Sequence, residues 1–263
     1  MAPRVAATLP CRSESTRLYG KPLQQVGDRP ILEHLVAQLE RVDAIDEIVL
    51  AIGDAPSKRS YVDVATTHGL EYVVGSTERV LDRLIDAAEA VAADTVVRTT
   101  TENPVVHWEN LTELVESHTR AGADFSVTRD LPHGAPVEVV SIDALRTARD
   151  EGEQRHRGEA STSYITENPG SFTIQTADPP AVLRRPEIRV TVDNPCDLQF
   201  VRAVYERLPD ESEPLSLFDV VDVIDEHPAL LDINGHKPDG TDEAVRSGAP
   251  IRYGTDRSRD SRT

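Results

Sequence analysis

The 263-residue sequence has few cysteines and contains no long apolar run. Its two cysteines, Cys11 and Cys196, are too few for a disulfide framework and lack metal-ligand spacing, so we expect both to be reduced. The absence of an apolar run of about 18 residues and of a signal-peptide pattern indicates a soluble, cytoplasmic protein. The length fits one large α/β domain, or such a domain with a small appendage.

Lysine and aromatic residues are also scarce. The chain has three lysines (Lys21, Lys58 and Lys237), and its 28 basic residues face 46 acidic ones, for a formal net charge of −18. This charge argues against nucleic-acid or membrane-surface binding, because both require a basic face. Acidic excess, arginine in place of lysine and an aromatic content of 4% resemble a halophilic proteome. We therefore expect thermal stability to depend on KCl.

The most informative segment is residues 10–23, PCRSESTRLYGKPL, which directly follows a predicted apolar strand at residues 5–9. It places Arg12, Arg17 and Lys21 in one short loop. An irregular backbone rich in Ser, Thr and Gly can direct N–H groups inward, which suits an anion such as phosphate. The alternative is a turn whose arginines pair with surface carboxylates.

Apolar periodicity predicts an α/β fold for the first half of the chain. Buried strands are expected at residues 5–9, 47–52, 71–74 and 95–99, alternating with helices at 30–42, 77–92 and 108–121, with Asp28 as the N-cap of the first helix. Strands separated by helices pair in parallel. In the second half we expect strands at 124–128, 137–141, 171–176 and 187–192, helices at 143–150 and 215–225, and a helix capped by Asn194 with Pro195 at its first position.

Residues 151–159 read as an exposed charged loop, and 251–263 as a disordered tail after a single domain spanning 1–250.

Three polar segments follow predicted strand ends, at residues 10–21, 75–79 and 100–104. Ligands in a doubly wound sheet lie beyond the carboxyl ends of its strands, so these segments are expected to line one crevice. Glu102 lies in the last of them, and Asp193 follows the predicted strand at 187–192. Two carboxylates facing a cationic loop suit a magnesium–nucleotide complex. Alternatively, Glu102 is a surface loop charge and Asp193 an acid that opens the following helix.

The same segments resemble one family in the same order along the chain. PCRSESTRLYGKPL resembles the P-A-R-x-x-S-T-R-L-P-G-K-P-L signature of the sugar-acid cytidylyltransferases, which include 3-deoxy-manno-octulosonate, acylneuraminate and spore-coat polysaccharide cytidylyltransferase-like proteins. GSTERVLDRL is similar to the family's G-S-x-x-D-V-L-D-R, and VVRTTTENPVV to its strand followed by T-G-D-x-P-L-I. VTVDNPCDLQFVRAVYERL resembles T-V-D-T-P-E-D-L-x-x-V. The likeness extends from about residue 4 to residue 235.

The resemblance implies a Rossmann-like nucleotidyltransferase fold, with a mostly parallel central sheet and helices on both faces. It implies transfer of CMP from CTP to an acidic sugar with release of pyrophosphate, in polysaccharide or glycan biosynthesis. The nucleotide half would span residues 1–122, and the sugar and dimer half 123–250, with a homodimer contact within 130–165. Carried over by position, the expected roles are Arg12 and Lys21 on the triphosphate, Arg17 supporting the loop, Ser15, Ser76 and Thr100 on the nucleotide, and Glu102 and Asp193 on Mg²⁺.

Some positions depart from the family pattern. Glu14 replaces a small residue, and its carboxylate would repel a triphosphate unless it points outward or helps to bind the metal. Thr101 and Glu102 replace a Gly-Asp pair, and Thr101 adds a Cβ where the resemblance implies a close approach of the backbone to the nucleotide. The Arg-Glu-His that often precedes the family's Thr-Pro-Tyr is missing, so the choice of sugar stays open.

Two residues of the sugar half are candidate contacts with the acceptor. Glu138 is a possible sugar or metal contact, although a strand carboxylate on a solvent face is the competing interpretation. His133 lies in the expected sugar loop. His107, His133 and His156 are not spaced as ligands, and we assign all three to the surface.

Two other functions stay open at this point. One is a nucleotidyltransferase that uses another NTP or a non-sugar acceptor, because base selection rests on contacts that the sequence does not place. The other is a catalytically silent nucleotide-sugar-binding protein, which the departures at Glu14, Thr101 and Glu102 would favour.

Overall fold

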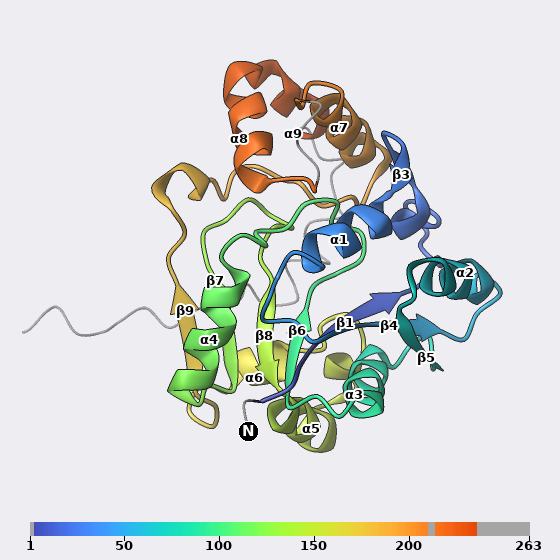
Figure 1. Cartoon of the computed structure of the whole chain (residues 1–263), viewed down its shortest axis with the longest axis vertical. Coiled ribbons are helices and arrows are strands. Elements are labelled where there is room, and N and C mark those ends of the chain that lie inside the picture. The colour runs from blue at the N-terminus through green and yellow to red at the C-terminus, as the bar shows by residue number, and fades with distance from the viewer. Residues whose placement is uncertain (1–2, 210–213, 236–263) are drawn as a thin grey trace, which may run out of the picture.

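The computed structural model describes residues 3–209 and 214–235, in which seven strands form the central sheet (Figure 1). The sheet strands are β1 (Val5–Cys11), β4 (Glu47–Gly53), β5 (Glu71–Gly75), β6 (Thr95–Arg98), β7 (Phe125–Thr128), β8 (Glu138–Ser141) and β9 (Ile174–Ala177). A separate hairpin is formed by β2 (Gln25–Val26) and β3 (Arg29–Pro30). The α-helices are α1 (Ile31–Leu39), α2 (Lys58–His68), α3 (Val80–Ala90), α4 (Leu111–Ala121), α5 (Ile142–Glu151), α6 (Ser163–Glu167), α7 (Pro195–Tyr205), α8 (Leu217–Glu226) and α9 (Asp232–Gly235).

The strand order is β5-β4-β1-β6-β8-β7-β9. The first four strands are parallel to one another, as the sequence predicted. β8 runs antiparallel to both of its neighbours, and β9 is parallel to β7. The sheet is therefore mostly parallel, and its polar strand-end segments meet at one edge.

Both faces of the sheet are covered by helices. The β1 residue Ala7 and the β6 residue Val97 face a core shared with α1, α2 and α4. Their neighbours Ala6 and Val96 point to the opposite core, which contains apolar side chains of α3 and α5. This alternation is what buried strands require, and it confirms the predicted Rossmann-like architecture.

A further apolar cluster joins α7 and α8 to the β2–β3 hairpin and to the segment before α7. Figure 1 shows α7, α8 and α9 gathered at one end of the molecule, opposite α5. The α7 N-terminus carries the predicted cap: Asn194 precedes Pro195, and Asn194 and Asp197 form a capping box. The cap fixes the backbone at Asp193, directly before the helix.

Three expectations about local structure are wrong. Asp28 does not cap α1, because residues 25–30 form the β2–β3 hairpin and the N-cap is Pro30. Residues 187–192 are not a sheet strand, since their only bridge joins Arg189 to His133. The stretch 151–159 is not a fully exposed loop, because it contains a 3-10 helix, η2 (Gln154–Arg157). The tail expected at 251–263 lies outside the described residues.

Two histidines assigned to the surface are buried instead. His107 is 3% exposed and His156 2% exposed. His156 accepts a hydrogen bond from the backbone N–H of Glu153 at 2.8 Å, and its other ring nitrogen lies 3.2 Å from Glu167. Polar partners and ring packing against Tyr164 explain why this histidine is stable in the interior.

Helix α2 was not expected from the sequence. Its buried side chains are Tyr61 and Ala65, one turn apart, and Val62 and Val64 between them are half-buried against the same core. The apolar residues are confined to this one turn, which gives too short a period to recognise. Among the described helices, none combines the length and the apolar character needed to cross a membrane.

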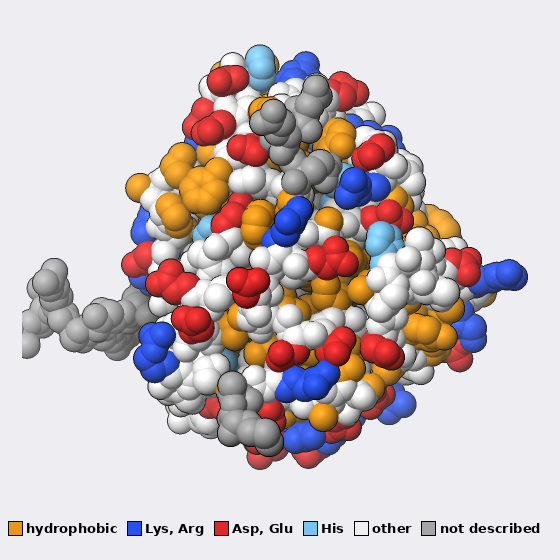
Figure 2. All heavy atoms as spheres, viewed as in Figure 1, with side chains coloured by type: hydrophobic (Ala, Val, Ile, Leu, Met, Phe, Trp, Pro, Cys, Tyr) orange, Lys and Arg blue, Asp and Glu red, His pale blue; other side chains and the backbone are white. Residues whose placement is uncertain are grey.

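Figure 2 shows acidic side chains spread over the visible face with lysine and arginine side chains among them. Ion pairs such as Arg146 with Glu89 and Arg185 with Asp225 use part of this charge. Exposed pairs of this kind contribute little to stability, so the fold rests on its apolar cores.

Two buried histidines should make stability depend on pH. His107 and His118 are each 3% exposed, and burial lowers the pKa of each to about 4. In the unfolded chain the pKa of a histidine is about 6.5. The contribution of these neutral, buried histidines to the free energy of unfolding is therefore fully present above pH 6.5 and is lost as the pH falls toward about 4, because the unfolded chain binds protons that the folded chain does not. Each is worth up to about 3 kcal/mol. Urea unfolding at pH 7 and pH 4.5 measures how much free energy of unfolding is lost on acidification. We expect this loss to be smaller in His118→Gln than in wild type, and an equal loss in both proteins would contradict the prediction.

Candidate active site

The loop after β1 is pinned at both ends. The backbone N–H of Gly20 donates to the carbonyl of Ser13 at 2.9 Å, and the Ser13 hydroxyl lies 2.9 Å from the Tyr61 hydroxyl. Gly20 has φ +64°, which glycine adopts without strain, and it turns the chain into the 3-10 helix η1 (Lys21–Leu23). Lys21 is therefore held at the start of a short helix, with 9% of its surface exposed.

A cavity of about 1120 Å³ opens beyond the carboxyl ends of β1 and β6. Its lining contains every predicted site residue except Ser76: Arg12, Ser15, Arg17, Lys21, Thr100, Glu102, His133, Glu138 and Asp193. Ser76 lies before α3, where its hydroxyl is 3.4 Å from the backbone nitrogen of Arg79. The structure thus brings the cationic loop and both proposed metal carboxylates to one cavity.

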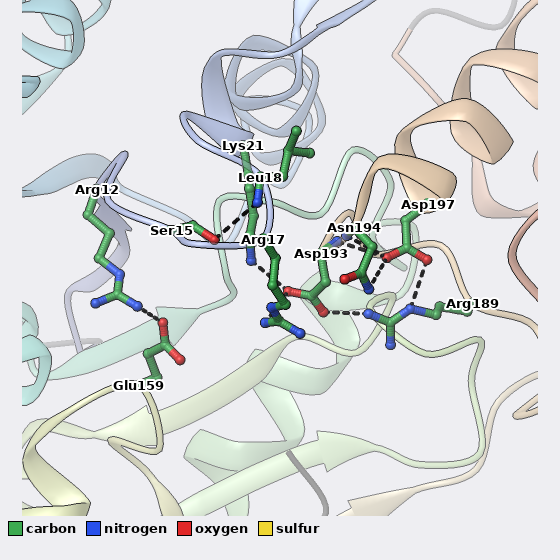
Figure 3. A network of polar contacts seen from close by, with 10 residues as sticks. All are labelled: Arg12, Ser15, Arg17, Leu18, Lys21, Glu159, Arg189, Asp193, Asn194 and Asp197. Carbon is green, nitrogen blue, oxygen red and sulfur yellow. Dashed lines mark hydrogen bonds and ion pairs between the residues drawn. The ribbon is translucent and has the colours of Figure 1, made fainter. Parts of the chain in front are cut away.

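Asp193 lies at the centre of the polar network (Figure 3). Its Oδ1 accepts from Lys21 Nζ at 2.6 Å and from Arg17 at 3.2 Å, and its Oδ2 accepts from Arg189. Burial would raise the pKa of Asp193, but the hydrogen bond from Lys21 and the charges of all three cations outweigh burial and hold it below its usual value. Asp193 is therefore ionised at neutral pH.

Glu102 faces the same cavity and is partly exposed. Desolvation raises its pKa, the charge of Lys21 lowers it, and the charge of Asp193 raises it again. The net effect is a pKa above the usual value for Glu102, and both carboxylates line the same cavity. Two negative groups in one cavity repel each other until a cation lies between them, which is the electrostatic condition for a divalent ion.

The far side of the cavity is built from a second set of charges. Arg98, at the end of β6, donates to the Glu138 carboxylate at 3.0 Å and to the carbonyl of Glu159 at 3.0 Å. Glu138 is 8% exposed and also accepts from Thr162 at 3.1 Å. The solvent-face interpretation of Glu138 is therefore wrong, because β8 turns this side chain toward the cavity and Arg98 neutralises it there. Arg12 forms an ion pair with Glu159, at a distance from the Asp193 cluster in Figure 3.

The departures from the family pattern have clear places in the structure. Glu14 is exposed and accepts a hydrogen bond from the Ser57 hydroxyl at 2.9 Å, so it has a partner outside the Asp193 cluster. Thr101 is buried, and its hydroxyl donates to the carbonyl of Pro10 at 2.8 Å. The extra Cβ thus serves to tie the β6 loop to the end of β1.

Gly134 holds the His133 loop against the segment that leads to Asp193. It has φ +102°, and a Cβ at this position would lie 2.7 Å from Thr191 Cβ and 2.8 Å from its backbone nitrogen. We expect Gly134→Ala to lower the free energy of unfolding by about 2 kcal/mol, measured in urea, and to impair activity. Gly69→Ala is the matched control, since Gly69 also has positive φ (+66°) but open space around it. Equal losses in both variants would rule out the close contact as the cause.

Sequence reasoning missed several charged residues of the cavity region, among them Arg98, Glu159, Arg189 and Asp197. A signal existed for Asp197, because Asn194 followed three residues later by an acid is a capping-box pattern. Arg98 and Glu159 pair with partners at least 40 residues away, so no local pattern could reveal them, whereas Arg189 pairs with Asp193 only four residues further along the chain.

A divalent metal is implied by the chemistry of the site. Within the described ranges, no three His, Cys, Asp or Glu side chains are grouped as a complete metal site. Magnesium does not need such a group, since it usually takes one or two protein carboxylates together with waters and substrate phosphates. Glu102 and Asp193 supply hard oxygen donors of this kind beside the cations Lys21 and Arg17, so the residues present fit Mg²⁺.

Comparisons with known proteins agree with this geometry. A family model described as Cytidylyltransferase matches residues 6–215. The spore coat polysaccharide biosynthesis protein SpsF of Bacillus subtilis is 28% identical over 222 residues, which cover 82% of this chain and 92% of that protein. The 3-deoxy-manno-octulosonate cytidylyltransferase of Trichlorobacter lovleyi is 28% identical over 115 residues, 43% of this chain and 44% of that enzyme.

Solved structures share the fold. A cytidylyltransferase from Leptospira borgpetersenii superposes with a TM-score of 0.80 at 21% identity, covering 89% of this chain and 98% of that one. A CMP:2-keto-3-deoxy-manno-octonic acid synthetase complexed with CTP gives a TM-score of 0.60 at 17% identity, over 78% of this chain and 99% of that one. Since the family model spans more than half of the sequence, and the fold and motif order agree with it, this chain belongs to the cytidylyltransferase family.

Proposed function

We propose that this protein transfers CMP from CTP to an acidic sugar in a magnesium-dependent reaction that releases pyrophosphate. The observation that carries the proposal is the meeting of Lys21 and Arg17 with Asp193 in a cavity that also contains Glu102. Cations bind the phosphates of a nucleotide, and the carboxylates suit the metal ion that accompanies it. The name of the 3-deoxy-manno-octulosonate cytidylyltransferase relative supports a sugar acceptor, and the name of SpsF supports a role in polysaccharide biosynthesis.

The reaction requires positioning and charge neutralisation rather than a covalent intermediate. A hydroxyl oxygen of the sugar attacks the α-phosphorus of CTP and forms a new P–O bond, and the hydroxyl proton is released to water. The bond from the α-phosphorus to the bridging oxygen breaks, so that pyrophosphate leaves with the electron pair. Lys21 and Arg12 stabilise the negative charge on the phosphate oxygens. Magnesium, when bound by Glu102 and Asp193, would neutralise further phosphate charge.

The sugar is expected on the side of the cavity formed by β6 and β8. Glu138, at the start of β8, and His133 line the cavity, and so do the cations Arg98, at the end of β6, and Arg129, just after β7. Hydroxyl groups of a sugar can donate to carboxylates such as Glu138, and a sugar carboxylate needs a cation. This mixture of charges favours an acidic, polyhydroxylated acceptor over an apolar one.

A pyrophosphate-release assay tests the function. Each of the four NTPs is offered with a panel of acidic sugars, including ulosonic acids, in the presence and absence of Mg²⁺ and over a range of KCl concentrations. We expect release to require CTP, an acidic sugar and Mg²⁺ together. Release from another NTP would assign a different base, and CTP binding without turnover on any acceptor would indicate a binding protein. A homodimer and a cytoplasmic location remain predictions.

A further inference from the structure

The two carboxylate oxygens of Asp193 are held from opposite sides. Oδ1 accepts from Lys21 at 2.6 Å and from Arg17 at 3.2 Å, and both cations belong to the loop after β1. Oδ2 accepts from Arg189, which approaches from the other side of the carboxylate in Figure 3. The cations expected to bind phosphate and the remaining cation therefore use different oxygens.

Arg189 is itself fixed by the start of α7. Its Nε donates to Asp197 Oδ1 at 3.1 Å, and Asp197 is 2% exposed. The other oxygen of Asp197 accepts from the backbone N–H groups of Asp193 at 3.1 Å and Asn194 at 2.9 Å. The Asn234 side chain donates to the carbonyl of Arg189 at 3.1 Å. Arg189 thus belongs to a hydrogen-bond network around the start of α7, and none of the contacts in this network involves the loop after β1.

This separation matters when a nucleotide binds. A triphosphate competes with Asp193 for Lys21 and Arg17, because it carries more negative charge than one carboxylate. Once those cations turn to the phosphates, Oδ1 loses its partners while Oδ2 keeps its own. We propose that Arg189 is a positioning residue that holds Asp193 through Oδ2 while Oδ1 becomes available to the metal ion. This role rests on the proposed function.

The change in divalent-cation affinity on removal of Arg189 distinguishes a positioning role from simple charge repulsion, because the two predict changes in opposite directions. Arg189 carries a positive charge near the proposed metal position, so by Coulomb's law its removal should strengthen cation binding. If Arg189 orients Asp193, its removal should weaken cation binding, because a carboxylate without a fixed orientation is a poorer ligand. Loss of a residue that orients a metal ligand typically costs 10-fold to 100-fold in metal affinity.

The experiment is a calorimetric titration of Mn²⁺ into protein with saturating CTP and no acceptor sugar, so that no turnover occurs. We expect Arg189→Gln to bind Mn²⁺ about tenfold more weakly than wild type. Arg189→Lys should recover part of the loss, since it keeps the charge but cannot bridge Asp193 and Asp197. The matched control is Arg185→Gln, which removes an arginine of the same segment that pairs with Glu187 and Asp225 and should bind like wild type.

Each outcome bears on the proposal. Unchanged or tighter Mn²⁺ binding in a folded Arg189→Gln variant overturns the positioning role. If that variant does not fold, Arg189→Lys decides: weaker binding than wild type supports the role, and equal binding overturns it. If wild type releases no pyrophosphate from any NTP, the proposed function fails, and the positioning role fails with it. If wild type turns over normally but Arg189→Gln binds Mn²⁺ like wild type, only the positioning role is rejected.

Discussion

Replacing Lys21 with alanine should lower kcat/KM for CTP at least tenfold, or about 1.4 kcal/mol of transition-state stabilisation. Lys21 is held at the start of η1, faces the cavity and lies 2.6 Å from Asp193, so its ammonium group is already in place to neutralise phosphate charge. The substitution removes that charge, and Asp193 keeps Arg17 and Arg189 as partners. CTP binding should weaken along with turnover, which calorimetry and the pyrophosphate assay would measure separately.

Lys58→Ala is the matched control for Lys21→Ala. Lys58 is also a lysine at the start of a helix, but its side chain is 49% exposed and pairs with Asp54, four residues earlier in the bend before α2. It does not line the cavity, so its removal should leave kcat/KM unchanged. Wild-type kinetics in folded Lys21→Ala, with thermal unfolding used to verify the fold, would reject the proposed phosphate site.

Asp193→Asn should separate nucleotide binding from turnover. The substitution preserves the shape of the side chain but removes the negative charge that neutralises Lys21, Arg17 and Arg189. The freed cations should bind CTP at least as tightly as in wild type when no metal is added. Turnover with Mg²⁺ should nevertheless fall at least tenfold, because an amide is a weak ligand for a divalent cation.

The two variants should therefore differ in CTP affinity but agree in turnover. Lys21→Ala should bind CTP more weakly than wild type, whereas Asp193→Asn should bind it at least as tightly, and both should turn over more slowly. Calorimetry without metal and steady-state kinetics across Mg²⁺ concentrations test the two halves. Asp219→Asn is a suitable control, since it removes a carboxylate on α8 outside the cavity lining. If Asp193→Asn turned over like wild type, Asp193 would not be a metal ligand.

Local sequence patterns predicted most of the sheet. The runs at residues 5–9 and 47–52 became β1 and β4 because apolar β-branched residues flanked by helical stretches can be buried on both faces. Residues 187–192 are also rich in β-branched residues but form no sheet strand. Whether an extended segment joins a sheet depends on a neighbour with free hydrogen-bonding groups, and its partner here is the 133–134 turn rather than a strand.

The histidines show a similar limit. His107, His118 and His156 have no local pattern that distinguishes a buried position from an exposed one. His118 is stable inside because Ser126, on a different element, lies 2.9 Å from its ring nitrogen. The partner that makes a polar side chain tolerable in the core is generally distant in sequence, so burial of such residues follows from packing.

The sequence by itself determined the α/β architecture, the cationic loop at residues 10–23 and the two acids, because each depends on residue type and spacing within a short stretch. Only the tertiary structure decided that Lys21, Arg17 and Arg189 share the carboxylate of Asp193, that Arg98 pairs with Glu138, and that Ser76 lies outside the cavity. The physical reason is that charged side chains interact over a few ångströms, and a contact across 172 residues of sequence exists only once the chain has packed.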